Sequence, residues 1–279
     1  MSKLNKNLEA LMTNSAQHLE QHFDVAFSAP NGIKKLRELI LTLAMQGKLV
    51  PQDPKNAPAS ELLKDIANEK ERLINEGKIK KQKPLPAISD DEKPYDLPQG
   101  WEWVRLGDCG YLQTGTTPAT KDPRNYGNFI PFIGPGDIQN GAINYYANGL
   151  SQEGLASARL IESGSILMVC IGGSIGKFAV SDRDVTCNQQ INTITAFKPI
   201  PIEYLGVTMA SSYFQNQVLI NASGSATPII NKQKWSEIIV PLPPLAEQKR
   251  IVAKIDQLMS LCDNLEQQIT ASQVKQSEL

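Results

Sequence analysis

The chain has 279 residues and a formal net charge of −1, and 41% of its residues are hydrophobic. This length allows one large or two modest domains with helical arms, and the apolar content is too high for a wholly disordered protein. The near-zero charge argues against a broadly basic chain, although a local basic patch is compatible with it. No apolar run approaches the ~18 residues needed to span a bilayer, and the N-terminus lacks the apolar region of a signal peptide.

The first 23 residues are predicted to form a helix with Leu4, Leu8 and Leu11 on one face. His18 and His22 stand four residues apart on it, a spacing that suits either a metal clip or a polar helix face. They are the only histidines of the chain, and no third ligand lies nearby in the sequence. We therefore predict no metal site.

Four cysteines are scattered without the spacing of two cysteines separated by two residues. They are Cys109, Cys170, Cys187 and Cys262. This pattern indicates reduced thiols and predicts a cytoplasmic protein.

A second helix is predicted to follow the break at Asn31-Gly32. Its apolar residues Ile33, Leu36, Ile40 and Leu43 step by three, four and three, and Gly47 can end it as a C-cap glycine. A turn-rich connector then leads from Pro51 to Pro54.

A third helix is predicted with Ser60 as its N-cap, ending at Gly77. Four lysines follow within residues 78–83, and they either meet DNA phosphates or keep a linker in water. Four prolines among acidic residues then mark residues 84–98 as a wrapped linker or a boundary.

From Trp101 to Val240 the pattern changes to short β-rich runs between glycine-rich turns. The expected strands are residues 101–106, 129–133, 165–171, 178–180, 190–197 and 238–240, and the expected helices are residues 201–212 and 214–219. Because residues 190–194 alternate in character, Gln190 and Ile191 are expected on opposite faces of a strand. The fold class predicted is α+β: a mixed α/β domain flanked by helical segments.

The last thirty-odd residues predict a long coiled-coil helix that begins after Pro243 and Pro244, with Glu247 in its first turn. Its apolar seam steps by four and three residues through Ile251, Ile255, Leu258, Cys262, Leu265 and Ile269. A helix over residues 245–275 would be roughly 45 Å long and needs a mate, which is the 33–43 helix, the same helix of a second chain, or both. No stop signal precedes Leu279, so we expect either a naturally short form or a piece of a longer protein.

The sequence carries no complete enzyme motif. Residues 172–177 resemble a phosphate loop with one residue too few between the outer glycines, and Phe178 stands where Ser or Thr would bind magnesium. The 242–245 run lacks the polar and aromatic residues of an amino-methyltransferase loop. Residues 97–244 contain no histidine, which excludes Ser-His-Asp and Cys-His triads there. We predict a non-catalytic chain without a cofactor.

Five polar loops instead carry residues that hydrogen-bond to bases and phosphates, although any one of them also fits a solvated turn. They span residues 114–117, 121–126, 174–177, 188–190 and 223–227. The predicted DNA-contacting residues are Thr116, Thr117, Lys121, Arg124, Ser174, Lys177, Asn188, Gln189, Ser225 and Thr227.

Several blocks, in order, resemble the DNA-specificity subunit of type I restriction–modification systems. They are Leu49–Pro54, Glu71–Lys81, Leu97–Trp103, Asn188–Asn192 and Pro241–Ile255, the last containing the most specific run, LPPLAEQKRIV. The resemblance covers nearly everything from about residue 33 onward.

That resemblance implies a domain organisation: an N-terminal helix outside the firm match (1–30), a helical conserved segment with a linker (31–96), one target-recognition domain (97–244) and one conserved helix (245–279). Family members have two recognition domains, each reading half of a split DNA site, joined by two conserved helices that pack antiparallel. Here there is one of each. The resemblance therefore implies a half-subunit whose two-fold homodimer restores the missing half.

The implied partners are double-stranded DNA, methyltransferase subunits and restriction/motor subunits, with no membrane. The alternative hypothesis is a coiled-coil adaptor whose globular domain binds protein rather than DNA. The target bases and the spacing of the half-sites do not follow from the sequence.

Overall fold

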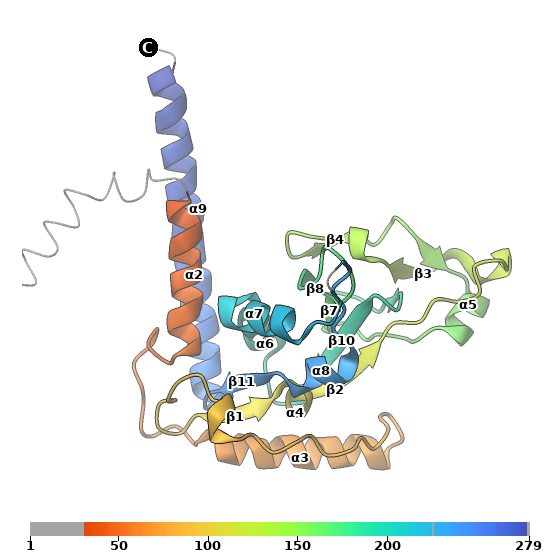
Figure 1. Ribbon diagram of the computed structural model, residues 1–279, viewed down its shortest axis with the longest axis horizontal. Helices are drawn as coiled ribbons and strands as arrows, with labels where there is room; N and C mark the ends of the chain where they lie inside the picture. Colours follow the sequence, from red (N-terminus) through yellow and green to blue (C-terminus); the bar gives the residue numbers. More distant parts are fainter. Residues whose placement is uncertain (1–30, 225, 278–279) are drawn as a thin grey trace, which may run out of the picture. The chain divides into compact units, whose positions relative to one another are not determined.

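A computed structural model describes residues 31–224 and 226–277 (Figure 1). These residues belong to two compact units: residues 31–40 with 255–277, and residues 41–254. The predicted first helix with its two histidines, and Ser225, lie outside the described residues. No helix in the described part is long and apolar enough to cross a membrane. All four cysteines are buried, unpaired thiols.

Helices form in the five segments of the described chain where they are predicted, and three short helices, α4, α5 and α8, are additional. The α-helices are α2 (Gly32–Met45), α3 (Ala59–Asn75), α4 (Leu106–Cys109), α5 (Gln152–Ser157), α6 (Ile202–Ala210), α7 (Ser212–Asn221), α8 (Lys232–Glu237) and α9 (Leu245–Ser277). The 3₁₀ turns are η1 (Asp90–Glu92), η2 (Pro123–Asn125) and η3 (Pro135–Asp137).

The strands form one four-stranded antiparallel sheet and three smaller sheets. The strands are β1 (Glu102–Arg105), β2 (Gly110–Thr114), β3 (Tyr126–Ile133), β4 (Ile138–Gln139), β5 (Ala142–Ile143), β6 (Gly149–Leu150), β7 (Ile166–Val169), β8 (Phe178–Val180), β9 (Thr186–Cys187), β10 (Ile191–Ala196) and β11 (Ile239–Leu242). The strand orders are β2-β10-β7-β8, β6-β3-β9, β1-β11 and β4-β5.

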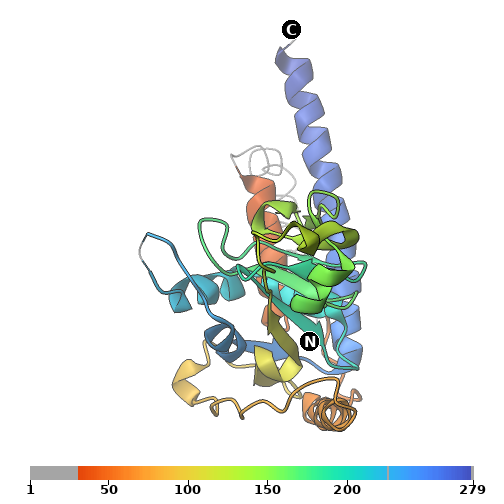
Figure 2. The same cartoon turned by 90° about the vertical axis from the view of Figure 1, so that its right-hand side faces the viewer.

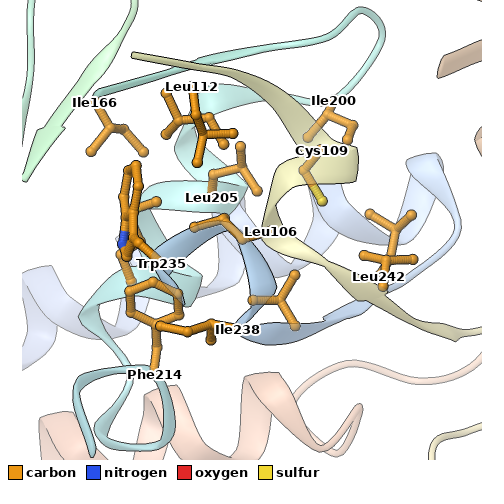
Figure 3. Close-up of a cluster of buried hydrophobic side chains, with 14 of the residues drawn as sticks. Leu106, Cys109, Leu112, Ile166, Ile200, Leu205, Phe214, Trp235, Ile238 and Leu242 are labelled. Atoms are coloured by element: carbon orange, nitrogen blue, oxygen red, sulfur yellow. The ribbon is translucent and has the colours of Figure 1, made fainter. Parts of the chain in front are cut away.

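Strand β7 lies between two apolar cores, because its side chains alternate between the faces of the sheet. Ile166 and Met168 enter the core under α6, α7 and α8, whereas Leu167 and Val169 enter the core under β3 and β4. Figures 1 and 2 show these layers on either side of the sheet. Figure 3 shows the first core, in which the buried Trp235 is the largest side chain.

Strand β10 departs from the simple in-and-out pattern expected of residues 190–194. Ile191, Asn192, Thr193 and Ile194 are all buried. The strand is central, between β2 and β7, and both of its faces are covered, so burial no longer follows the two-residue period. The expectation that Ile191 belongs to the core is confirmed.

The predicted cap of α2 is confirmed, and the predicted cap of α3 is wrong. Gly47 has φ of +67°, and the Lys48 N–H donates to the Leu43 carbonyl at 2.8 Å, as at a glycine C-cap. Helix α3 begins at Ala59 with Pro58 as its N-cap, which places Ser60 inside the first turn. The Ala59 N–H donates to the Gly100 carbonyl at 2.8 Å, so a tertiary contact replaces the side-chain cap.

Within the unit of residues 31–40 and 255–277, α2 packs against α9. The guanidinium of Arg37 donates to Asp263 at 2.7 Å and to Glu266 at 2.8 Å. Four apolar side chains are buried: Ile33, Ile40, Ile255 and Cys262. The same-chain helix is therefore one mate of the predicted seam, and Figures 1 and 2 show α9 continuing beyond the N-terminal start of α2.

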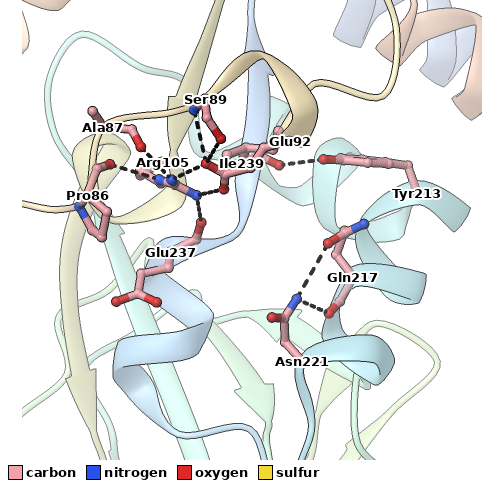
Figure 4. A network of polar contacts seen from close by, with 10 residues as sticks. All are labelled: Pro86, Ala87, Ser89, Glu92, Arg105, Tyr213, Gln217, Asn221, Glu237 and Ile239. Atoms are coloured by element: carbon pink, nitrogen blue, oxygen red, sulfur yellow. Dashed lines mark hydrogen bonds and ion pairs between the residues drawn. The ribbon is translucent and has the colours of Figure 1, made fainter.

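The proline-rich segment 84–98 is anchored on the domain by the buried guanidinium of Arg105 (Figure 4). Arg105 donates to the carbonyl oxygens of Pro86 and Ala87, each at 3.1 Å, and to the Glu92 carboxylate at 2.7 Å and 2.9 Å. Hydrogen bonds from Arg105, then from the backbone of Ser89, lower the pKa of Glu92 to about 2. This segment is part of the compact unit of residues 41–254.

The first turn of α9 carries a buried carboxylate that joins three segments of the same unit. Glu247 is 1% exposed. Its oxygens accept from Gln52 Nε2 at 2.6 Å and from Trp101 Nε1 at 3.1 Å, and Gln52 Nε2 also donates to the Gly47 carbonyl at 2.9 Å. Burial raises the pKa of Glu247, while the two hydrogen bonds oppose that rise.

We expect Glu247→Ala to lower the free energy of unfolding by about 1–3 kcal/mol, because the buried Trp101 N–H loses its acceptor and the Gln52 amide loses one of its two acceptors. Equilibrium denaturation by urea measures the change. Glu61→Ala is the matched control, since Glu61 is an exposed carboxylate in the first turn of α3 and should change stability by less than about 1 kcal/mol. Equal effects of the two substitutions would contradict a structural role for the buried carboxylate.

Candidate nucleic-acid interface

The register of the four-stranded sheet brings the predicted polar loops to one end. Strand β2 ends at Thr114, which lies opposite Asn192 of β10. Strand β7 ends at Val169, which pairs with Ile191 at the start of β10. Strand β8 begins at Phe178, which pairs with Met168 of β7. We call this edge, where β2 and β7 finish and β10 and β8 begin, the loop end of the sheet. Segments 115–125, 170–177 and 188–190 all leave the sheet there.

Segments 115–117 and 187–190 lie against each other at the loop end. The Thr116 N–H donates to the Cys187 carbonyl at 2.8 Å, and the Thr117 hydroxyl donates to Gln189 Oε1. A Cβ at Gly115 would stand 2.1 Å from the Asn188 carbonyl oxygen, so only glycine permits this approach.

Asn188 and Gln189 differ in what their side chains can still bind. Asn188 Oδ1 accepts from the Gln190 N–H at 3.0 Å, and Asn188 Nδ2 donates to Gln190 Oε1 at 3.2 Å. Gln189 is exposed, and its Nε2 makes no hydrogen bond to the described residues. The geometry therefore leaves Gln189 more available to a ligand than Asn188.

Segment 222–230 is hydrogen-bonded to the residues that directly follow β7. The Gly172 N–H donates to the Pro228 carbonyl at 2.9 Å, and the Ile230 N–H donates to the Cys170 carbonyl at 3.0 Å. The fifth predicted loop is thereby held beside the 170–177 loop, although it follows β10 by more than 20 residues in the sequence.

The structure thus places seven of the ten predicted residues in segments that meet at this end, whereas Lys121 and Arg124 lie further along the 115–125 segment, where the Ser151 hydroxyl donates to the Arg124 carbonyl; the tenth, Ser225, lies outside the described residues. Thr227 is exposed on segment 222–230, and Ser174 and Lys177 close a turn through a Lys177 N–H to Ser174 carbonyl bond of 3.1 Å. Lys121 is exposed on the 115–125 segment. No ligand is present, so contact of these residues with DNA stays a prediction.

Arg124 is the predicted residue whose charge is already neutralised. Its guanidinium contacts the Asp122 carboxylate at 3.0 Å and 2.7 Å, and Asp122 also accepts from the Arg124 N–H. The hydrogen bond from Arg124 lowers the pKa of Asp122, and the same pairing raises the pKa of Arg124. A phosphate would have to compete with this carboxylate.

Two further basic residues lie at the loop end that the sequence analysis does not predict as DNA-contacting residues. Arg159 donates to the Thr114 carbonyl, and Lys232 follows Ile230 by two residues. Desolvation, then repulsion from Arg159, lowers the pKa of Lys232. Among the described residues, neither has a carboxylate within salt-bridge distance. Neither residue belongs to a polar loop that the sequence patterns predict, so only the fold assigns them to this end.

A metal-based site finds no support in the described part of the chain, where no three His, Cys, Asp or Glu side chains cluster with metal-ligand geometry. Burial raises the pKa of the Cys187 thiol to about 12, so this sulfur beside the loops is not a thiolate at neutral pH. The arrangement offers amides, hydroxyls and cations, groups that bind ligands through hydrogen bonds and charge.

The family model and the most similar curated proteins found by comparison point to the same protein family. The type I restriction modification DNA specificity domain matches residues 98–274. The chain is 34% identical to the Type I restriction enzyme EcoAI specificity subunit of Escherichia coli, over 98% of this chain and 47% of that protein. It is 36% identical to the EcoEI specificity subunit of Escherichia coli, over 86% of this chain and 41% of that protein. The chain spans about half the length of these relatives.

Solved structures share the fold at lower sequence identity. The crystal structure of the HsdS subunit from Thermoanaerobacter tengcongensis aligns with a TM-score of 0.52 and 19% identity, over 85% of this chain and 49% of that one. A structure described as the basis of complex assembly and conformational transition of the type I R-M system aligns with a TM-score of 0.53 and 18% identity, over 99% of this chain and 55% of that one.

The geometry of the loop end predicts a large loss of stability for one substitution and almost none for a second one nearby. Ile191→Ala should lower the free energy of unfolding by about 2–5 kcal/mol, because it leaves a cavity in a fully buried site. Gln189→Ala should change it by less than about 0.5 kcal/mol, because this side chain is exposed. Thermal and urea unfolding of both variants measure this difference, and a destabilised Gln189→Ala would show that the residue serves the fold.

Proposed function

This chain belongs to the family of type I restriction–modification DNA-specificity proteins, and from that membership we propose that it selects the DNA target of a type I methyltransferase and endonuclease complex. It acts as a non-catalytic subunit in the cytoplasm and uses no cofactor. Its single recognition domain, residues 97–244, reads one half of a bipartite site.

The observation that carries this proposal is the convergence of the polar loops at the loop end of the sheet. Lys177, Arg159 and Lys232 supply positive charge there, and exposed side chains such as Gln189 supply directional hydrogen bonds. Cations position a protein on the phosphate backbone, whereas amides and hydroxyls distinguish base edges. One edge of the sheet therefore carries groups suited to both tasks, which supports the proposal.

We further propose that two copies of the chain assemble, with α9 in the interface. Two copies of this chain related by a two-fold axis would present two recognition domains, one for each half-site. Within the unit of residues 31–40 and 255–277, Leu258, Leu265 and Ile269 of the seam stay half-buried, and Leu261 is 52% exposed. This incompletely covered apolar surface supports a further mate besides α2. Methyltransferase subunits and restriction/motor subunits complete the proposed assembly.

The alternative of a coiled-coil adaptor for protein ligands has no observation in its favour. The DNA-binding experiment that tests the main proposal also tests this alternative, because a protein-binding adaptor would show no preference for any DNA duplex.

We expect the chain alone to bind duplex DNA weakly and with little selectivity, since residues 97–244 contain nine Lys/Arg and ten Asp/Glu. Together with its methyltransferase subunits it should bind one bipartite duplex selectively in a mobility-shift assay. The duplex is found first by mapping methylated sites in cells that carry the complete system. Gln189→Ala should reduce that selectivity without lowering thermal stability.

A scrambled duplex of the same length and composition is the control for this assay. Equal affinity of the complex for the mapped and scrambled duplexes would refute the proposed function. Tight, site-specific binding by the chain alone at physiological salt would contradict the expectation of weak binding by the isolated chain.

We expect Leu258→Asp with Leu265→Asp to abolish self-association and methyltransferase docking while the recognition domain stays folded. A carboxylate placed in an apolar seam costs several kcal/mol, which raises the dissociation constant of the dimer by at least about 100-fold. Light scattering across the micromolar range measures the mass, and circular dichroism reports the fold.

The matched control is Asn264→Asp with Gln268→Asp, which adds the same charge to exposed positions of α9. This variant should dimerise like the wild type. A wild-type chain that is monomeric throughout the range, with an unchanged double variant, would show that α9 packs only within its own chain.

A further inference from the structure

The hairpin of β4 and β5 is a structural element at the loop end that the sequence patterns did not single out. Gln139 pairs with Ala142, which leaves a two-residue turn of Asn140 and Gly141 with φ of +51° and +76°. Positive φ at both central residues defines the type I′ turn that Asn-Gly favours. Ile138 is 1% exposed and belongs to the core that β7 shares with β3, so the base of the hairpin is held firmly.

The hairpin places its tip beside the start of β8. Both β4 and β5 pack against β8, which begins at Phe178 at the loop end of the sheet. Between the tip and the 170–177 loop lies a hollow of about 470 Å³. Its lining residues are Ile138, Gln139, Asn140, Gly141, Gly176, Lys177 and Phe178.

Two polar side chains lining this hollow have no partner within the described part of the chain. Asn140 is exposed, and its carboxamide makes no hydrogen bond to any described residue. Lys177 is exposed, and no described carboxylate lies within salt-bridge distance of its ammonium group. In contrast, the Gln139 amide is engaged, because its Nε2 donates to the Gly136 carbonyl at 3.0 Å. The hollow therefore presents one carboxamide and one cation to a ligand.

We propose that the Asn140 hairpin enters the major groove and that its carboxamide reads an adenine, while Lys177 contacts a neighbouring phosphate. This inference rests on the proposed function and adds a specificity-determining residue to it. A two-stranded ribbon fits the major groove, and the donor and acceptor of an Asn carboxamide match N7 and N6–H₂ of adenine. The I′ turn orients Asn140 before binding, so little backbone freedom is lost on contact.

The test uses the complex of the chain with its methyltransferase subunits and the mapped bipartite duplex. A set of duplexes changes each base pair of one half-site in turn, and competition binding measures the discrimination at every position. Asn140→Gly removes the carboxamide and keeps the positive φ that the turn requires. It should reduce discrimination at one A·T pair by about 5- to 150-fold and leave the other positions unchanged.

Two further variants separate base reading from backbone contact. Asn140→Asp tolerates the same turn but cannot donate to adenine N7, so it should also lose the adenine preference. Lys177→Met should weaken binding about equally for all duplexes and reduce the slope of log affinity against log salt by about one. Lys64→Met, at an exposed lysine of α3, is the matched control and should change neither quantity.

The proposal fails if both Asn140 variants keep wild-type discrimination at every position, or if they weaken all duplexes equally. Thermal unfolding confirms that Asn140→Gly and Asn140→Asp stay folded, and a loss of adenine preference in either folded variant supports the proposal. A wild-type complex that prefers no duplex would refute the proposed function itself, and that result is distinct from failure of the hairpin to read a base.

Discussion

The buried carboxylate of Glu247 is the interaction on which the unit of residues 41–254 depends. It accepts hydrogen bonds from Gln52 and Trp101, partners that lie 195 and 146 residues away in the sequence. Three segments therefore meet at one group: the connector after α2, the entry to β1 and the first turn of α9. Burial disfavours the charged form, and two directed donors together with the N-terminus of a helix compensate for part of that cost.

Antiparallel pairing decides where the polar loops go. Because β2 and β7 run one way while β10 and β8 run the other, two strand ends and two strand starts meet at one edge. The loops are held by backbone bonds such as Thr116 to Cys187 and Gly172 to Pro228. The sheet is covered on both faces, so we expect substitutions of loop side chains to leave both cores undisturbed.

Helix α9 serves both units of the molecule with different chemistry. Its first turn contributes the Glu247 carboxylate, and Ile251 is fully buried in the unit of residues 41–254. Further along, in the unit of residues 31–40 and 255–277, Arg37 forms ion pairs with Asp263 and Glu266 beside a partly covered apolar seam. Exposed ion pairs contribute little stability, so the apolar seam is the stronger determinant of which helices associate.

Local sequence patterns determined the elements whose signals are contained within a few residues. Pro243 and Pro244 marked the start of α9, Gly47 marked the end of α2, and the β-rich runs located β1, β3, β7, β8, β10 and β11. The five polar loops were likewise visible as composition. Such features depend on backbone dihedral preferences and on side-chain period, which the neighbouring residues set.

Only the tertiary structure decided which of these pieces meet. Ser60 lost its predicted capping role because the Gly100 carbonyl satisfies the first amide of α3. β10 lost its alternating burial because α6, α7 and α8 cover one face and the β3 layer the other. Arg159, Lys232 and the Asn140 hairpin reach the loop end only through tertiary contacts. These outcomes depend on contacts between distant residues, and no local period carries that information.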